Sequence, residues 1–321
     1  MSERSLVELL RVELSRGRRE GVRIDIGDDA AVLRAPHGDL VMSVDASVED
    51  VHFRRGWATW DVLAARAFEA ALSDLAAMGS LPVAALVALA LPSTIRAIDV
   101  RQIARGLARA ARRGHCPVVG GNVTRAGEVS ITTTVLGEAT HPLERGGARV
   151  GDEVWVTGAL GGAALGLAVL ESTRRPRDTA PFVRRLLHPR ARIAAGRSLA
   201  LVARACIDLS DGLVSDLAHL AEASGVTIEI NASSLPRARG HDRLAERLGL
   251  DGVTLALTGG EDYELAFTAR RGAELSIRAH RIGRVVRGPG IVRVLGHDAP
   301  THRGHDHFAR TADQRATRPR P

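Results

Sequence analysis

The chain has 321 residues with 45% hydrophobic content, which is enough for two globular domains with buried cores. Its formal net charge is +7 at pH 7, and all 44 residues in the Lys and Arg total are Arg. The lack of lysine excludes mechanisms that depend on a side-chain amine, such as a P-loop lysine or a Schiff base. Chemistry carried by carboxylates remains.

The sequence also bears on location and partners. Residues 1–17 carry charges throughout, and no stretch contains 18 uninterrupted apolar residues, so we expect a cytoplasmic protein with no membrane contact. Cys116 and Cys206 lie in apolar runs, which indicates buried thiols rather than a disulfide framework or a thiolate metal site. Dispersed Arg residues and only 3% aromatic content argue against nucleic-acid binding.

The first half of the chain predicts a mixed α/β unit. Apolar residues at helical spacing predict helices over 5–15, 59–78 and 99–113. Apolar or β-branched runs predict strands over 40–44, 81–91 and 128–138. Thr59 is the expected N-cap of the second helix and Gly79 its stop signal.

A polar, turn-rich segment near 140–151 predicts the domain boundary. We expect an N-terminal α/β domain over 1–140, a C-terminal α/β domain over 141–308, and a disordered Arg-rich tail over 309–321. In the second domain the predicted helices cover 158–170, 180–187, 192–203 and 212–224. The predicted strands cover 153–157, 205–209, 226–230, 253–257, 263–268 and 281–286.

Acidic residues recur where apolar elements end. These acids are Asp28, Asp45, Asp74, Asp208, Asp211 and Glu261. The pattern suggests divalent metal ions that hold a polyphosphate in an inter-domain cleft. Each acid also has a plainer interpretation, which is a tight turn for Asp28, a structural hydrogen bond for Asp74 and a helix cap for Asp211.

Other polar residues also allow both a functional and a plain structural interpretation when each is considered alone. The glycine pair before Asn122 is typical of a phosphate-cradling turn or of a plain loop. Ser210 lies just before a predicted helix, where a hydroxyl and free backbone N–H groups favour phosphate. His52 fits a core or loop histidine, and Arg145 fits a solvated charge.

Six motifs in order carry a family resemblance. They are GDDAAV at 27–32, VEDVHF at 48–53, LSDLAAMG at 72–79, IDLSDGL at 207–213, GGEDYEL at 259–265 and GHDHF at 304–308. Through them the chain resembles the thiamine-monophosphate kinases, of the superfamily that includes aminoimidazole ribonucleotide synthetase. The resemblance covers about residues 22–308.

The resemblance implies a two-domain aminoimidazole ribonucleotide synthetase-like α/β fold with mixed sheets flanked by helices and an ATP cleft between the domains. It further implies a homodimer and Mg²⁺-dependent, direct transfer of the γ-phosphate of ATP to thiamine monophosphate. By motif, the Mg²⁺ ligands would be Asp28, Ser43, Asp45, Asp74, Asn122, Asp208 and Asp211. Gly121, Asn122, Arg145 and Ser210 would contact ATP, and His52, Glu261 and Phe308 would contact the thiamine moiety.

The chain departs from the family pattern at several positions. Asn122 stands where Asp is usual, Val44 where Thr is common, and Asp50 where a Gly is usual. Ala104 often corresponds to Tyr, and Gly161-Gly162 replaces Gly-Asp. These differences leave three alternatives to the kinase: a weakened paralogue, a related synthetase with another acceptor, and a non-catalytic protein that binds nucleotide or thiamine phosphate.

Overall fold

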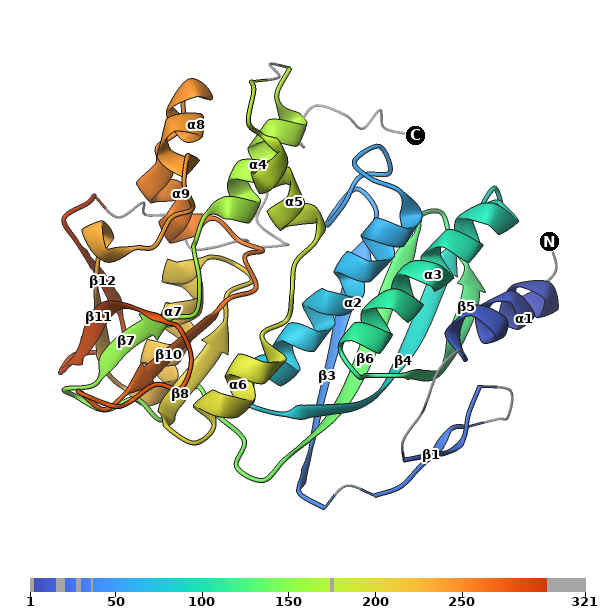
Figure 1. The fold of residues 1–321 in the computed structure, drawn as a ribbon, viewed down its shortest axis with the longest axis horizontal. Coiled ribbons are helices and arrows are strands. Elements are labelled where there is room, and N and C mark those ends of the chain that lie inside the picture. Colours follow the sequence, from blue (N-terminus) through green and yellow to red (C-terminus); the bar gives the residue numbers. More distant parts are fainter. Residues whose placement is uncertain (1–2, 16–20, 27–29, 36, 174–175, 299–321) are drawn as a thin grey trace, which may run out of the picture.

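Two β-sheets with their helices lie side by side along the long axis of the molecule (Figure 1). The computed structural model describes residues 3–15, 21–26, 30–35, 37–173 and 176–298. The predicted mixed sheets flanked by helices are confirmed. Among the helices in these ranges, none is long and apolar enough to cross a membrane.

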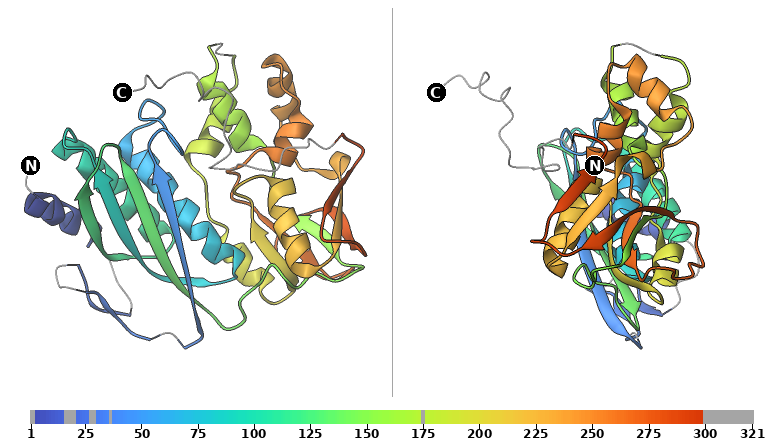
Figure 2. Two further views of the ribbon diagram at one scale, coloured as in Figure 1. Left: turned by 180° about the vertical axis from the view of Figure 1, so that it is seen from behind. Right: turned by 90° about the vertical axis from the view of Figure 1, so that its left-hand side faces the viewer.

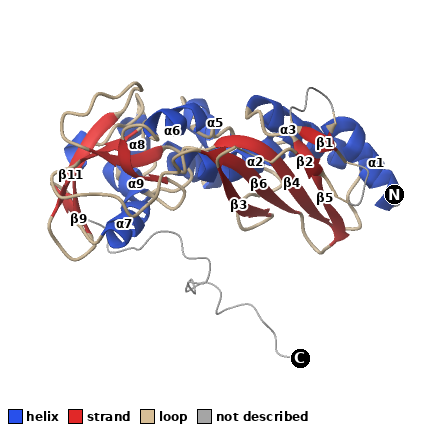
Figure 3. Ribbon diagram, turned by 90° about the horizontal axis from the view of Figure 1, so that it is seen from below, coloured by secondary structure: helices blue, strands red, loops and turns tan. Residues whose placement is uncertain are grey.

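The N-terminal sheet has the strand order β3-β6-β4-β5, with only β4 and β5 parallel. Its strands are β3 (Asp39–Val48), β4 (Leu81–Leu91), β5 (Val118–Arg125) and β6 (Ser130–Ala139). Helices α2 (Trp60–Ala77) and α3 (Ala97–Arg113) cover one face, and α1 (Glu3–Leu14) packs on α3. Figure 3 shows these helices on one side of the sheet. Strands β1 (Val22–Ile24) and β2 (Val32–Leu33) form a separate short ribbon.

The C-terminal sheet has the order β12-β9-β11-β7-β10-β8, antiparallel except between β12 and β9. Its strands are β7 (Glu153–Val156), β8 (Ala203–Asp208), β9 (Thr227–Asn231), β10 (Leu265–Ala269), β11 (His280–Val286) and β12 (Val292–Leu295). Its helices are α4 (Gly162–Glu171), α5 (Ala180–Leu187), α6 (Ile193–Leu199), α7 (Leu213–Ser224), α8 (His241–Arg247) and α9 (Gly252–Thr258), with a 3₁₀ turn η1 (Ala232–Ser234).

Helix α2 joins the two halves of the molecule. Its C-terminal residues Ala76 and Ala77 share one apolar cluster with Cys206 of β8 and with Leu265 and Phe267 of β10. The small alanine side chains let α2 approach the second sheet while its other side covers the first. Both views in which the sheets stand side by side, Figure 1 and the left panel of Figure 2, place α2 between them.

Both cysteines are buried and free, as the apolar runs predicted. Cys116 and Cys206 are 0% and 2% exposed. Burial raises the pKa of Cys116 to about 12, so its thiol is inert as a nucleophile at neutral pH.

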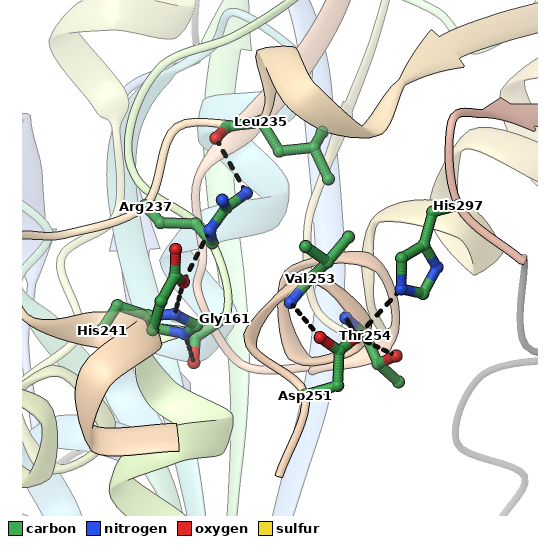
Figure 4. Close-up of polar contacts among 9 residues, drawn as sticks. Gly161, Leu235, Arg237, His241, Asp251, Val253, Thr254 and His297 are labelled. Carbon is green, nitrogen blue, oxygen red and sulfur yellow. Dashed lines mark hydrogen bonds and ion pairs between the residues drawn. The ribbon is translucent and has the colours of Figure 1, made fainter. Parts of the chain in front are cut away.

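Two predicted elements are wrong. The alternating run 253–257 was expected to be a strand, but it forms α9, because the Asp251 side chain accepts hydrogen bonds from the Val253 and Thr254 backbone N–H groups and starts a helix (Figure 4). The glycine pair Gly120-Gly121 with Asn122 was expected to be a turn, but it lies inside β5. Pairing of β5 with β4 overrides the local turn preference there.

Candidate functional site

Three of the predicted metal-binding carboxylates lie around α2, in the region where this helix touches both sheets. Asp45 lies on β3, Asp74 near the end of α2, and Asp208 at the end of β8. Burial raises the pKa of all three, and the negative charge of Asp74 raises the pKa of both Asp45 and Asp208 further. The pKa of Asp208 rises to about 6. Carboxylates brought together in this way favour a cation among them.

Two predicted residues act on the Asp74 carboxylate. The Ser43 hydroxyl, which lies on the same strand face as Asp45, donates a hydrogen bond to Asp74 Oδ2. The exposed Arg145 side chain lowers the pKa of both Asp74 and Asp208 by its positive charge. Arg145 therefore lies near the carboxylates and is free in solvent to meet a further anion.

Asp211 does not cap α7. Instead Asp216, one turn into the helix, accepts hydrogen bonds from the backbone N–H groups of Asp211 (3.2 Å) and Gly212 (3.1 Å). Burial and the charges of Asp211 and Asp208 raise the pKa of Asp216 to about 8. The capping interpretation of Asp211 is wrong, since Gly212 is the N-cap and Asp216 accepts the hydrogen bonds.

The loop that carries Glu261 runs beside the end of β8. The Glu261 N–H donates to Ser210 O (2.7 Å) and the Tyr263 N–H donates to Leu209 O (2.9 Å). These bonds place the Glu261 backbone next to Ser210. The Glu261 carboxylate reaches across to Arg66 of α2 and forms an ion pair with it.

His52 lies in the tight turn after β3. Its Nδ1 accepts a hydrogen bond from the Val48 N–H (3.0 Å), so the neutral ring carries its proton on Nε2. Asp50 in this turn has φ +63°, a conformation that favours glycine. The neighbouring Arg54 pairs with Glu171 of α4 at 3.5 Å, so the turn faces the C-terminal half.

Asn122 does not join the carboxylates within one chain. Strands β3 and β5 form opposite edges of the four-stranded sheet, about 14 Å apart at ordinary strand spacing. In register, Asn122 pairs with Ala88, Ala88 with Thr132, and Thr132 with Ala46. Asn122 therefore shares a sheet face with Ala46, whereas Asp45 points to the opposite face.

Gly121 is a glycine for steric reasons. Its φ is +155°, and a Cβ atom there would lie 1.8 Å from Val87 O on β4. The close packing of its backbone against β4 explains the glycine without any ligand. The expected contact of Gly121 with ATP phosphates therefore stays a prediction.

The comparisons with known proteins agree with this architecture. The family model described as AIR synthase related protein, N-terminal domain, matches residues 27–139, and the model for the C-terminal domain matches 149–296. Thiamine-monophosphate kinase of Aquifex aeolicus is 36% identical over 271 residues, which cover 83% of this chain and 88% of the relative. This chain belongs to the thiamine-monophosphate kinase family.

Other members of the thiamine-monophosphate kinase family match over comparable lengths. The Bacillus subtilis protein is 38% identical over 256 residues, 77% of this chain and 78% of the relative. The solved structure of AaThiL complexed with AMPPCP and TMP has a TM-score of 0.80 and 34% identity, and covers 95% of this chain and 97% of that one. The predicted aminoimidazole ribonucleotide synthetase-like fold is confirmed.

The donor atoms present fit a hard divalent cation. Carboxylate and hydroxyl oxygens from Asp45, Asp74, Asp208 and Ser43 are the ligand types that Mg²⁺ prefers. Within the described ranges, no three His, Cys, Asp or Glu side chains are close enough together to hold an ion unaided. Mg²⁺ is commonly held by one or two carboxylates together with substrate phosphates, so such a spread set suits it.

Two predicted residues lie outside the described residues, and two further residues were missed. Asp28 and Phe308 fall in 27–29 and 299–321. Arg66 and Asp216 were not predicted, although both are charged residues inside helices that otherwise bury apolar faces. A buried charge needs a partner, and that signal was present in the sequence.

Proposed function

We propose that this protein transfers the γ-phosphoryl group of ATP to thiamine monophosphate and releases thiamine diphosphate and ADP. Family membership supports this activity, as does the binding of AMPPCP and TMP by AaThiL. The observation that carries the proposal is that Asp45, Asp74 and Asp208 lie around α2, which also carries Arg66, the ion-pair partner of Glu261. The proposed metal ligands and the proposed acceptor-binding acid are therefore both linked to this helix.

The chemistry needs positioning and charge compensation more than a base. A phosphate monoester is already largely dianionic near pH 7, so the acceptor oxygen needs no deprotonation. The obstacle is repulsion between the acceptor and the phosphates of ATP. Because the acceptor oxygen is already a competent nucleophile, we propose that it attacks the γ-phosphorus of ATP directly and in line, with no covalent phosphoenzyme.

The carboxylates would hold the metal. Asp28, Asp45, Asp74, Asp208 and Asp211 are the proposed Mg²⁺ ligands, with Ser43 orienting Asp74. When bound, Mg²⁺ supplies positive charge that neutralises the phosphate oxygens.

The remaining roles divide between the two substrates. Arg145, Gly121 and Ser210 would bind ATP, and Arg145 suits its phosphates because guanidinium makes charge-assisted bonds to them. His52, Glu261 and Phe308 would bind thiamine, whose cationic ring complements Glu261.

A cytoplasmic location of the protein stays a prediction.

We further propose a homodimer that completes the site. None of the helices in the described ranges covers the other face of the N-terminal sheet, where Leu40, Met42 and Val44 are 50%, 59% and 63% exposed. An apolar sheet face of this kind favours a second sheet packed upon it. Two departures from the family pattern, Val44 and Asn122, both lie on this face. Association of two copies can bring β5 of one next to β3 of the other, which a single chain cannot do.

The decisive experiment is a discontinuous assay of thiamine diphosphate formation with purified protein, ATP, Mg²⁺ and thiamine monophosphate. We expect product from the natural chain and its loss, by about 10²-fold or more, in Asp74→Ala, since electrostatic stabilisation is removed. Chelation of Mg²⁺ should abolish the product reversibly. No product from the natural chain at saturating substrates would refute the kinase.

Asn122 favours one second candidate, a binding protein with a weakened metal site. Asn keeps a carbonyl oxygen but lacks the negative charge of Asp. We expect Asn122→Asp to change activity modestly if the chain is a kinase. Ligand binding without turnover in the natural chain, together with turnover in Asn122→Asp, would support the second candidate instead.

A further inference from the structure

Arg66 is a buried cation at the junction of the two domains. It lies on the side of α2 that faces the C-terminal half, and its side chain is only 3% exposed. Its Nε donates to Leu186 O at the end of α5 (3.1 Å), and its Nη2 donates to Glu261 Oε2. These two hydrogen bonds, through Nε and Nη2, fix the orientation of the guanidinium plane.

The charges around Arg66 come from both halves of the proposed site. Burial alone would lower its pKa, but Glu261, Tyr263 and Asp45 together raise that pKa above its ordinary value. Arg66 also lowers the pKa of Asp45. The guanidinium thus lies near Asp45, a proposed metal ligand, as well as beside Glu261, the acid assigned to the acceptor.

The backbone around Glu261 is strained and cannot by itself fix the side chain. Glu261 has φ +68° and Tyr263 has φ +49°, both in the region that favours glycine. Backbone hydrogen bonds to Leu209 and Ser210 pin the loop but leave the side-chain torsions open. Within the part of the chain that the structure describes, the ion pair with Arg66 is the contact that holds the Glu261 carboxylate.

We propose that Arg66 is a positioning residue that holds the Glu261 carboxylate toward the acceptor, across the domain junction. The proposal rests on the proposed function, because it takes Glu261 as the acceptor-binding acid. A lysine at this position would keep the charge but could not span both Leu186 O and Glu261 with a fixed planar fork.

A neighbouring ion pair on α2 provides a matched control. Glu69, one turn along the helix, is buried, pairs with Arg113 and accepts a hydrogen bond from the Ala191 N–H (2.8 Å). This pair also links α2 to the C-terminal half, but it does not contact Glu261. Loss of either Arg removes an ion pair of α2, and Arg66 is the more deeply buried of the two, so a purely structural role of Arg66 should appear as a larger fall in melting temperature without a selective change in one KM.

The experiment compares Arg66→Met, Arg66→Lys and Arg113→Met in steady-state kinetics, with melting temperatures measured alongside. We expect Arg66→Met to raise KM for thiamine monophosphate by about tenfold or more, since a buried charge partner is lost, with KM for ATP within about twofold. Arg66→Lys should give an intermediate KM. Arg113→Met should lower the melting temperature without moving either KM. Equal, unselective effects of Arg66→Met and Arg113→Met would overturn the proposal.

A structural readout separates this proposal from the assigned activity. Crystal structures of the natural chain and of Arg66→Lys, which retains charge for folding, show where the Glu261 carboxylate lies. A displaced carboxylate supports the positioning role even if the natural chain makes no thiamine diphosphate, an outcome that would refute only the kinase. A carboxylate that keeps its place without the guanidinium overturns the positioning role, whatever the activity.

Discussion

Asp50 occupies a backbone conformation that suits glycine better. Its φ of +63° lies in the left-handed region, where a Cβ atom crowds the backbone, although Asp tolerates it better than most residues. Its N–H donates to Phe53 O (2.7 Å), so the turn that presents His52 depends on this geometry. The family pattern, with glycine here, is the less strained solution.

We expect Asp50→Gly to raise the free energy of unfolding by about 0.5–1 kcal/mol, because relief of strain exceeds the entropy that glycine adds to the unfolded chain. Urea denaturation measures this. Asp39→Gly, at the exposed start of β3 where φ is not positive, is the control and should be destabilised by a similar amount. Equal losses in both variants would show that Asp50 is not strained.

At the scale of elements, α9 depends on one cap. Asp251 Oδ2 accepts hydrogen bonds from the Thr254 N–H (2.7 Å) and the Thr254 hydroxyl (2.6 Å), and His297 Nε2 lies 3.0 Å from the same oxygen (Figure 4). The Thr254 hydroxyl, the backbone N–H and His297 together lower the pKa of Asp251 to about 2. The ionised carboxylate is thus the form that the fold prefers.

Asp251→Ala should lower the free energy of unfolding by about 1 kcal/mol at pH 7, as for other lost caps. Because the folded pKa lies below the unfolded value near 4, this contribution is present above pH 4 and is lost as pH falls toward 2. Denaturation curves should therefore show a smaller difference in the free energy of unfolding between the natural chain and Asp251→Ala at pH 2.5 than at pH 7. Asp251→Asn keeps an acceptor and should lose less; a gap unchanged at pH 2.5 would contradict the role of the charge.

The sequence predicted long, strongly patterned elements well and short ones poorly. The 81–91 strand is confirmed with the same bounds, and the helix expected over 59–78 is confirmed to within one residue at each end. The run 253–257 alternates like a strand, but a seven-residue element is decided by its cap rather than by its period. In β5, the close approach of Gly121 to Val87 is a tertiary contact that local turn preferences cannot reveal.

The same limit applies to the site. Acids at the ends of apolar elements predicted a shared site for Asp45, Asp74 and Asp208; the three lie near enough for Asp74 to raise the pKa of the other two, but their common role as metal ligands stays a prediction. Arg66 and Asp216 stand out in the sequence as charges inside apolar helices, but their partners depend on which helix face meets which loop, and the sequence does not reveal this. The roles of individual residues in binding, and the domain division near residue 140, stay predictions.

At the scale of the whole molecule, the uncovered sheet face predicts the oligomeric state. We expect the natural chain to be a dimer by size-exclusion chromatography with light scattering. Met42→Arg should shift it toward monomer, because a charge at the centre of an apolar interface must be desolvated, and activity per chain should fall with it. Leu201→Arg, at an 87% exposed position off this face, is the control. A monomeric natural chain would end the dimer proposal.

Strands β3 and β5 lie at opposite edges of one sheet, so two damaged copies should be able to repair each other when mixed. A chain with Asp74→Ala and a chain with Asn122→Ala, which adds no charge to the proposed dimer face, would each form dimers with defective sites. A mixed dimer would contain one site that inherits both defects and one that inherits neither. After random exchange of subunits, about a quarter of natural activity should return. Such complementation would make the two catalytic centres a shared property of the pair rather than of either polypeptide.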